Sequence, residues 1–91
     1  MNFAPEAAQD LKRLKTHVRA EVEDALDKHL RHEPAKVSMS RIKRLRGFSH
    51  PQYRLMVGEI RVFYDITGRV VEVLAIVPKS KAASWLEEMG E

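Results

Sequence analysis

The segment YRLMVGEIRVFYDITGRVVEVLAIV, residues 53–77, constrains the fold more than any other part of the chain. Apolar and polar residues alternate along it, and glycine-containing pairs interrupt the alternation twice. A period of two predicts strands, and a short glycine-containing break between two such runs predicts a hairpin turn. We therefore expect three consecutive antiparallel strands.

The first turn, at Gly58-Glu59, sets the pairing of the first two strands. It places Val57 opposite Ile60 and Met56 opposite Arg61. Because side chains alternate, one face is apolar, with Tyr53, Leu55, Val57, Ile60, Val62, Tyr64 and Ile66. The other face carries Arg54, Met56, Arg61, Phe63 and Asp65.

The centre of the second turn is either Thr67-Gly68 or Gly68-Arg69. Both alternatives predict that the third strand adds four residues to the apolar face, Val71, Val73, Ala75 and Val77. The opposite side of this strand is also largely apolar, with Val70, Leu74 and Ile76 around Glu72. This pattern predicts a central strand that is covered on both sides.

Two amphipathic helices precede the strands. Pro5 suits the first helical position because its missing N–H would have no partner there, and one apolar face follows with Ala7, Ala8, Leu11 and Leu14. Thr16 is a candidate cap for a second helix, whose apolar stripe comprises Val18, Val22, Ala25, Leu26 and Leu30. Pro34 ends this helix near Arg31 or His32. Such a helical hairpin must cover an apolar surface.

The remaining segments show weaker patterns. Residues 2–4 are compatible with a short strand, and residues 37–41 with an extended segment. Ile42 and Leu45 should anchor the segment Arg41–Gly47 to the core, before a loop over residues 47–51. A final helix over residues 82–89 would place three apolar side chains on one side, Trp85, Leu86 and Met89.

Together these elements define the expected fold class. Ninety-one residues suffice for one domain with a modest core, and they leave little room for a cofactor-sized cavity. We expect an α+β fold in which a helical hairpin packs on one face of a small antiparallel sheet. The expected order is (β)ααβββ with a short C-terminal helix, in a single domain over residues 1–91 and without a cofactor.

Composition excludes several kinds of site. The chain contains no cysteine, which removes disulfides, thiolate nucleophiles and cysteine-based zinc sites. The four histidines are scattered, so we expect no metal site. The N-terminal segment lacks the apolar run of a signal peptide, and the longest apolar run, Val73 to Val77, is far too short to span a membrane. We therefore expect a cytoplasmic protein that does not enter membranes.

Basic residues are concentrated in the middle of the chain. The net charge is only +3, but residues 34–58 contain six lysines or arginines and no acid. These bases are Lys36, Arg41, Lys43, Arg44, Arg46 and Arg54. An acid-free basic block of this length predicts an anionic partner, with nucleic acid as the leading candidate.

The basic residues on and after the strands also suit RNA cleavage without a metal. If the 2′-hydroxyl attacks the adjacent phosphate, the reaction needs a proton acceptor, stabilisation of the extra phosphate charge and help for the departing 5′-oxygen. Arginine stays protonated and binds phosphate through two N–H groups, and aromatic rings stack on bases. The candidate set is Arg54, Arg61, Lys79 and Lys81, with Phe63 and Trp85 nearby. The same residues also fit an ordinary solvated sheet surface, and the pattern alone does not separate these interpretations.

The strand segment YRLMVGEIRVFYDITGRVVEVLAI resembles the signature of the RelE/ParE superfamily of toxins from bacterial toxin–antitoxin systems. PEAAQDLKRL, HVRAEVEDAL and RIKRLRGF lie upstream in the same order as in that family, so the resemblance covers nearly the whole chain. It implies helices packed on an antiparallel sheet, with a co-encoded antitoxin protein as partner. It also implies one of two activities. The RelE branch cuts messenger RNA in the ribosomal A site by metal-free 2′-hydroxyl attack, whereas the ParE branch inhibits DNA gyrase.

The resemblance assigns roles position by position. The family's basic strand residues match Arg54 and Arg61, and its late basic residues match Lys79 and Lys81. A further basic position of the family falls at Met56. The family's C-terminal tyrosine position falls near Trp85-Leu86, and no tyrosine follows Tyr64 in this chain.

The resulting hypothesis is a toxin that acts as a ribosome-dependent mRNA endoribonuclease. Its catalytic residues would be Arg54, Arg61, Lys79 and Lys81. Its RNA-binding residues would be Arg41, Lys43, Arg44, Arg46, Phe63 and Trp85. The expected partners are a cognate antitoxin protein and messenger RNA in the ribosomal A site. The alternatives are a ParE-type gyrase inhibitor and a catalytically inactive relative that only binds its antitoxin.

Overall fold

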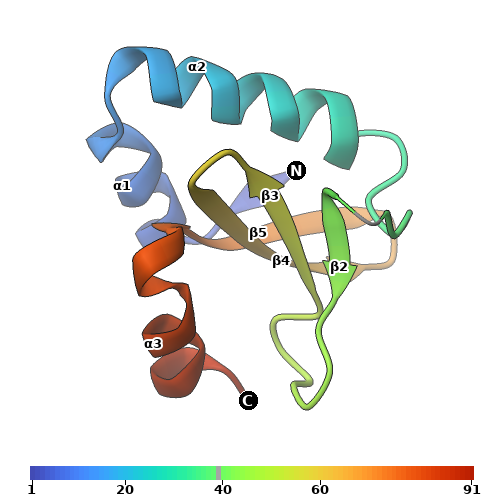
Figure 1. Ribbon diagram of the computed structural model, residues 1–91. Helices are drawn as coiled ribbons and strands as arrows, with labels where there is room; N and C mark the ends of the chain where they lie inside the picture. Colours follow the sequence, from blue (N-terminus) through green and yellow to red (C-terminus); the bar gives the residue numbers. More distant parts are fainter. Residues whose placement is uncertain (39) are drawn as a thin grey trace.

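The computed structural model describes residues 1–38 and 40–91 (Figure 1). Its elements are β1 (Asn2–Phe3), α1 (Pro5–Arg13), α2 (Thr16–Ala25), the π-helical turn η1 (Leu26–Leu30), β2 (Ile42–Arg44), β3 (Tyr53–Val57), β4 (Ile60–Thr67), β5 (Val70–Pro78) and α3 (Lys79–Met89). The strands form one sheet in the order β1-β5-β4-β3-β2. All neighbours are antiparallel except β1 and β5, which run parallel. The predicted α+β class and the short C-terminal helix are confirmed.

The hairpin between β3 and β4 has the predicted register. Val57 pairs with Ile60 and Met56 pairs with Arg61. Gly58 has φ of 55° at the first central position of the turn, where a type II′ hairpin turn needs a positive φ that glycine adopts without strain. Thr67 pairs with Val70, so the second turn is centred on Gly68-Arg69 rather than Thr67-Gly68.

The predicted register of the third strand is wrong in its second half. Phe63 pairs with Ala75 but Tyr64 pairs with Val73, so Leu74 is an extra residue and forms a β-bulge. One extra residue reverses the side-chain alternation beyond it. Ile76 therefore joins Val71 and Val73 in the main core, whereas Ala75 and Val77 lie on the opposite face of the sheet.

The helical hairpin covers one face of the sheet, which we call the hairpin face (Figure 1). Ala7 of α1 is fully buried there, and Leu11 and Leu14 pack against the same core. The predicted stripe of the second helix is confirmed, with Val18 partly buried and four residues buried, Val22, Ala25, Leu26 and Leu30. Each fully buried valine or leucine among them contributes roughly 1.5–3 kcal/mol by leaving water. The helix cap is Lys15 rather than Thr16, which is the first helical residue.

Two elements differ from the prediction. The segment that contains Ile42 is an edge strand, β2, whose pairing with β3 places Ile42 opposite Leu55. Helix α3 starts at Lys79, earlier than the predicted start at Ala82, and it lies on the side of the sheet away from the hairpin (Figure 1). In the predicted extended segment 37–41, residue 39 lies outside the described residues, and the others are not in a strand. No helix in the described part of the chain is long and apolar enough to cross a bilayer.

Candidate nucleic-acid interface

The side of the sheet away from α1 and α2, which we call the outer face, carries four of the ten candidate residues, Lys43, Arg54, Arg61 and Phe63. Directly paired residues share a face, so the register defines this set. It includes Lys43 of β2, Arg54 and Met56 of β3, Arg61, Phe63 and Asp65 of β4, and Ala75 and Val77 of β5, with Thr67, Val70 and the acidic Glu72 toward the β4–β5 turn. Lys43, Arg54, Phe63 and Ala75 thus form one row across four strands.

Helix α3 covers the half of the outer face formed by β4 and β5. The Trp85 ring stacks on the Phe63 ring with 4.9 Å between centroids and 6° between planes. The Lys79 N–H donates to the Glu59 carbonyl oxygen at 2.7 Å, which fixes the start of the helix beside the β3–β4 turn. Phe63 is completely buried by this packing, so its ring offers no face to an RNA base in this arrangement.

Arg61 is held by the turn that precedes it. One guanidinium nitrogen, Nη1, donates to the carbonyl oxygens of Gly58 at 2.8 Å and Ile60 at 3.1 Å. Only 7% of the residue is exposed. Hydrogen bonds from a charged group contribute about 1.5–3 kcal/mol each, so Arg61 closes the β3–β4 turn in addition to any role toward a ligand.

Arg54, by contrast, has few partners. Its Nη2 contacts the Met56 sulfur at 3.5 Å, and sulfur is a weak acceptor. Its Nε is buried and has no hydrogen-bond partner among the described residues. Burial and the nearby positive charge of Arg61 lower the pKa of the Arg54 guanidinium from its ordinary value. A negative charge beside the guanidinium would favour its protonated form and so oppose both effects on the pKa.

A pocket of about 250 Å³ lies beside Arg54, at the edge of the sheet. It is lined by Ser38, Arg41, Ile42, Lys43, Arg54 and Met56. The structure therefore brings together three of the predicted site residues, Arg41, Lys43 and Arg54. Met56, which replaces a basic residue of the family pattern, forms part of the wall.

The other predicted residues lie elsewhere. Lys79 and Lys81 are exposed in the first turn of α3, next to the β3–β4 turn but outside the pocket lining. Arg44 lies on the hairpin face, where its Nη1 donates to the Tyr53 hydroxyl at 3.0 Å and its guanidinium sits 5.0 Å from the ring centroid. Arg46 is exposed in the loop that follows β2.

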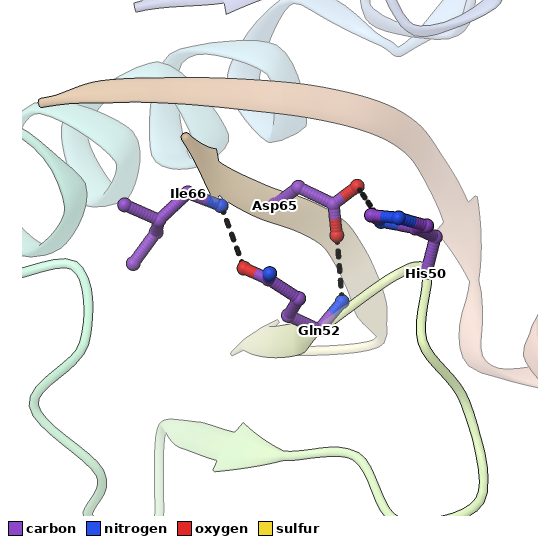
Figure 2. A network of polar contacts seen from close by, with 4 residues as sticks. All are labelled: His50, Gln52, Asp65 and Ile66. Atoms are coloured by element: carbon purple, nitrogen blue, oxygen red, sulfur yellow. Dashed lines mark hydrogen bonds and ion pairs between the residues drawn. The ribbon is translucent and has the colours of Figure 1, made fainter. Parts of the chain in front are cut away.

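A polar network that the sequence pattern did not reveal holds the loop before β3 (Figure 2). Asp65 accepts from the Gln52 backbone N–H at 2.7 Å, and its other oxygen lies 2.7 Å from His50 Nδ1. The Gln52 side-chain oxygen accepts from the Ile66 N–H at 2.9 Å. The Asp65 and Gln52 side chains thus supply hydrogen bonds between β4 and the segment before β3, beyond the last paired residues of the two strands. No local signal predicts the pairing, because His50 and Asp65 are far apart in the sequence.

The Asp65–His50 pair has the form of a proton-transfer pair, but its position argues for a structural role. Asp65 and Arg61 are separated by four residues along one strand, which corresponds to about 13 Å. The carboxylate of Asp65 is instead engaged by the Gln52 N–H and by His50, which ties the loop before β3 to β4. Within residues 1–38 and 40–91, no three histidine, aspartate or glutamate side chains are arranged to hold a metal ion.

Comparison with known structures supports the fold. The RelB-RelE antitoxin–toxin complex from Methanococcus jannaschii contains a chain that superimposes with a TM-score of 0.72 at 19% identity, covering 93% of this chain and 98% of that one. The archaeal RelE-RelB complex from Pyrococcus horikoshii OT3 gives a TM-score of 0.70 at 21% identity, covering 89% and 94%. At these identities the likeness shows a shared fold.

Sequence comparison shows the family. No curated protein sequence matches the chain. The family model described as the ParE toxin of the type II toxin–antitoxin system parDE, however, matches residues 1–83, which include every strand of the sheet and both helices of the hairpin. The chain therefore belongs to the ParE toxin family, within the RelE/ParE superfamily of type II toxin–antitoxin toxins.

Proposed function

We propose that this toxin arrests growth by cutting messenger RNA in the ribosomal A site, without a metal ion, and that a cognate antitoxin neutralises it. The observation that carries the proposal is the convergence of Arg41, Lys43 and Arg54 on one pocket of the outer face. Structures of similar fold are complexes of RelE with its antitoxin RelB, which supports both the activity and the partner.

The proposed reaction is an internal transfer at phosphorus. The RNA 2′-oxygen forms a bond to the adjacent phosphorus while the bond to the 5′-oxygen breaks, leaving a 2′,3′-cyclic phosphate and a 5′-hydroxyl. The phosphate gains negative charge in the transition state, so a preorganised cation lowers the barrier most. Arg54 suits this role because its side chain lines the pocket, and the partner of its Nη2, the Met56 sulfur, is a weak acceptor that it can exchange for a phosphate oxygen.

The remaining candidates assist in different ways. Arg61 supplies positive charge from a fixed position, because the carbonyl oxygens of Gly58 and Ile60 hold its guanidinium. Lys79 and Lys81, in the first turn of α3, would contact the RNA backbone or assist proton transfer between the two reacting oxygens. Exposed Arg46 would add affinity that falls with salt. Trp85 is half-buried and would stack on an RNA base.

A second candidate function is inhibition of DNA gyrase. The family model that matches residues 1–83 describes ParE toxins, which favours this alternative. In that case the toxin acts by binding a protein, and the outer face contributes affinity rather than chemistry. The absence of a tyrosine after Tyr64 fits this alternative as well.

One induction experiment distinguishes mRNA cleavage from gyrase inhibition. The toxin is expressed from a tightly repressed promoter while amino-acid incorporation, DNA-damage signalling and the 5′ ends of messenger RNA are followed in parallel. We expect translation to stop first, with new 5′-hydroxyl ends inside coding regions. Early DNA-damage signalling without new RNA ends would instead establish the gyrase alternative. No toxicity, combined with tight binding of the neighbouring antitoxin, would show an inactive relative.

The same experiment tests the site. Arg54→Ala should abolish RNA cleavage, whereas Arg69→Ala removes an equal charge from the β4–β5 turn and should leave cleavage intact. The double variant Arg54→Ala/Arg61→Ala should be equally inactive. Undiminished growth inhibition by the double variant would refute the proposed site.

A further inference from the structure

Helix α3 and the two residues that follow it form a strap over the outer face, which we define as residues 79–91. None of the α3 residues, all of which the structure describes, is buried. The residue beneath them, Phe63 of β4, is completely buried, and the Trp85 ring stacks on it with 4.9 Å between ring centroids. Docking contributes free energy in proportion to the apolar surface removed from water, so a helix without buried residues contributes little by itself. The strap is therefore a cover whose hold on the sheet depends on a few contacts.

The end of the strap is fastened to the loop before β3. The Glu91 N–H donates to the His50 carbonyl oxygen at 2.8 Å, and the Glu91 backbone oxygen accepts from the Ser49 N–H at 2.6 Å. Gly90 lies so close to Phe48 that a β-carbon at position 90 would collide with the Phe48 ring. We call these contacts the latch. Its packing leaves room for glycine alone at position 90.

The loop that receives the latch is itself fixed to the sheet. His50 Nδ1 lies 2.7 Å from an Asp65 carboxylate oxygen of β4, and the Gln52 N–H donates to the other oxygen at 2.7 Å (Figure 2). The start of the helix is also fixed, because the Lys79 N–H donates to the Glu59 carbonyl oxygen. Release of the latch would therefore free the second half of the strap and leave its first turn in place.

The latched half of the strap lies outside the part of the chain that matches the family. The family model ends at residue 83, after every strand and both helices of the hairpin. Among the described residues, the main hydrophobic core contains no residue of the strap. Residues 84–91 can therefore leave the outer face without removing a side chain from the core that holds the sheet to the hairpin.

We propose that residues 84–91 gate the outer face: the latched strap masks Phe63 and keeps the toxin in a less active form, and release of the latch uncovers Phe63 and activates it. The Phe63 and Trp85 ring planes differ by only 6°, so in the closed form each ring covers a face of the other. Opening frees both faces for a flat ligand group. The inference rests on the proposed function for the identity of that group, an RNA base, and it concerns the regulation of the same surface.

The first measurement concerns opening of the strap. Gly90→Val should release the latch, because the added side chain has no room beside Phe48. Met89→Val is the matched control, since Met89 is the neighbouring residue and is 54% exposed. Opening is followed by hydrogen exchange of the Glu91 amide and by acrylamide quenching of Trp85, the single tryptophan of the chain. We expect Gly90→Val to speed the exchange about ten-fold or more and to increase quenching, and Met89→Val to change the exchange less than about two-fold.

The second measurement concerns activity, taken as the level of toxin that halves the growth rate when each variant is expressed from a titratable promoter. A molecule that acts only when open has its apparent affinity reduced by the open fraction, and release of the latch removes that reduction. We therefore expect Gly90→Val to halve growth at a level about three-fold lower or less, and Met89→Val to match the parent. Phe48→Ala loosens the latch from the loop side and should act in the same direction as Gly90→Val.

Two results would overturn the inference. Exchange and quenching in Gly90→Val no greater than in Met89→Val would show that the latch does not hold the strap. An open Gly90→Val protein that arrests growth no better than the parent would show that the strap is purely structural. The 5′ ends of messenger RNA separate this inference from the proposed function. Greater potency of Gly90→Val without new 5′-hydroxyl ends would reject mRNA cleavage alone, and equal potency with such ends would reject the gate alone.

Discussion

Each half of the outer face carries an arginine, and the two arginines differ in their hydrogen bonding. On the covered half, Arg61 is buried and donates to two carbonyl oxygens, those of Gly58 and Ile60. On the open half, the Nε–H of Arg54 is buried and has no acceptor among the described residues. The positive charge of nearby Arg61, together with burial, lowers the pKa of the Arg54 guanidinium. Satisfied polar groups stabilise the fold, whereas unsatisfied ones store free energy that a ligand can recover. The contacts on the covered half therefore stabilise the fold, and the open half carries the pocket that we propose as the RNA site.

The largest expected effect on stability lies at the centre of the covered half. Phe63→Ala should lower the free energy of unfolding by about 3–5 kcal/mol, because it leaves a cavity beneath Trp85 and removes their ring stacking. Arg54→Gln, at the directly paired position on β3, should change the free energy of unfolding by less than about 0.5 kcal/mol. Urea unfolding of both variants measures the difference. Similar losses for the two would abolish the distinction between the halves.

The comparison becomes sharper when both arginines receive the same substitution. Arg61→Met should cost about 2 kcal/mol, since two carbonyl oxygens of the β3–β4 turn lose a charged donor. Arg54→Met should leave stability unchanged or raise it, because the variant removes a desolvated charge that lies near Arg61. Thermal unfolding at matched pH and salt tests the pair. A larger loss for Arg54→Met would show that its guanidinium has a structural partner.

A smaller effect is expected at the Asp65 network. In Asp65→Asn the side chain can still accept from the Gln52 N–H, but it no longer offers a carboxylate to His50. We expect a loss of about 1 kcal/mol and faster hydrogen exchange of the Gln52 amide. Unchanged exchange at Gln52 would mean that Asp65 does not hold the loop.

The strands and helices that show strong periodicity were predictable. The pairing of β3 with β4 depends on a two-residue turn and on alternation, both of which are local. The stripe on the second helix likewise depends on spacing alone. Local periodicity carried less information elsewhere. Strand β2 contains one buried residue, Ile42, which is too few to show alternation, and Lys79-Ser80-Lys81 at the start of α3 has no apolar residue.

The bulge at Leu74 had no sequence signal because both faces of β5 are largely apolar. Either register would place apolar side chains against the hairpin, so the pattern cannot decide between them. Packing decides, because the bulge turns Ile76 toward the core and Ala75 toward Phe63. A small residue at position 75 then lies beside the large stacked pair of Phe63 and Trp85.

The sequence by itself determined the hairpin register, the amphipathic helices, the basic block and the family. All of these depend on residue types and on short spacings. Only the tertiary structure decided which candidate residues are available to a ligand. Arg54 and Arg61 have the same parity and charge. The carbonyl oxygens of Gly58 and Ile60 satisfy the Arg61 guanidinium, whereas the Arg54 Nε–H has no acceptor among the described residues. Such contacts form through space between distant segments, and the alternation of side chains along a strand does not encode them.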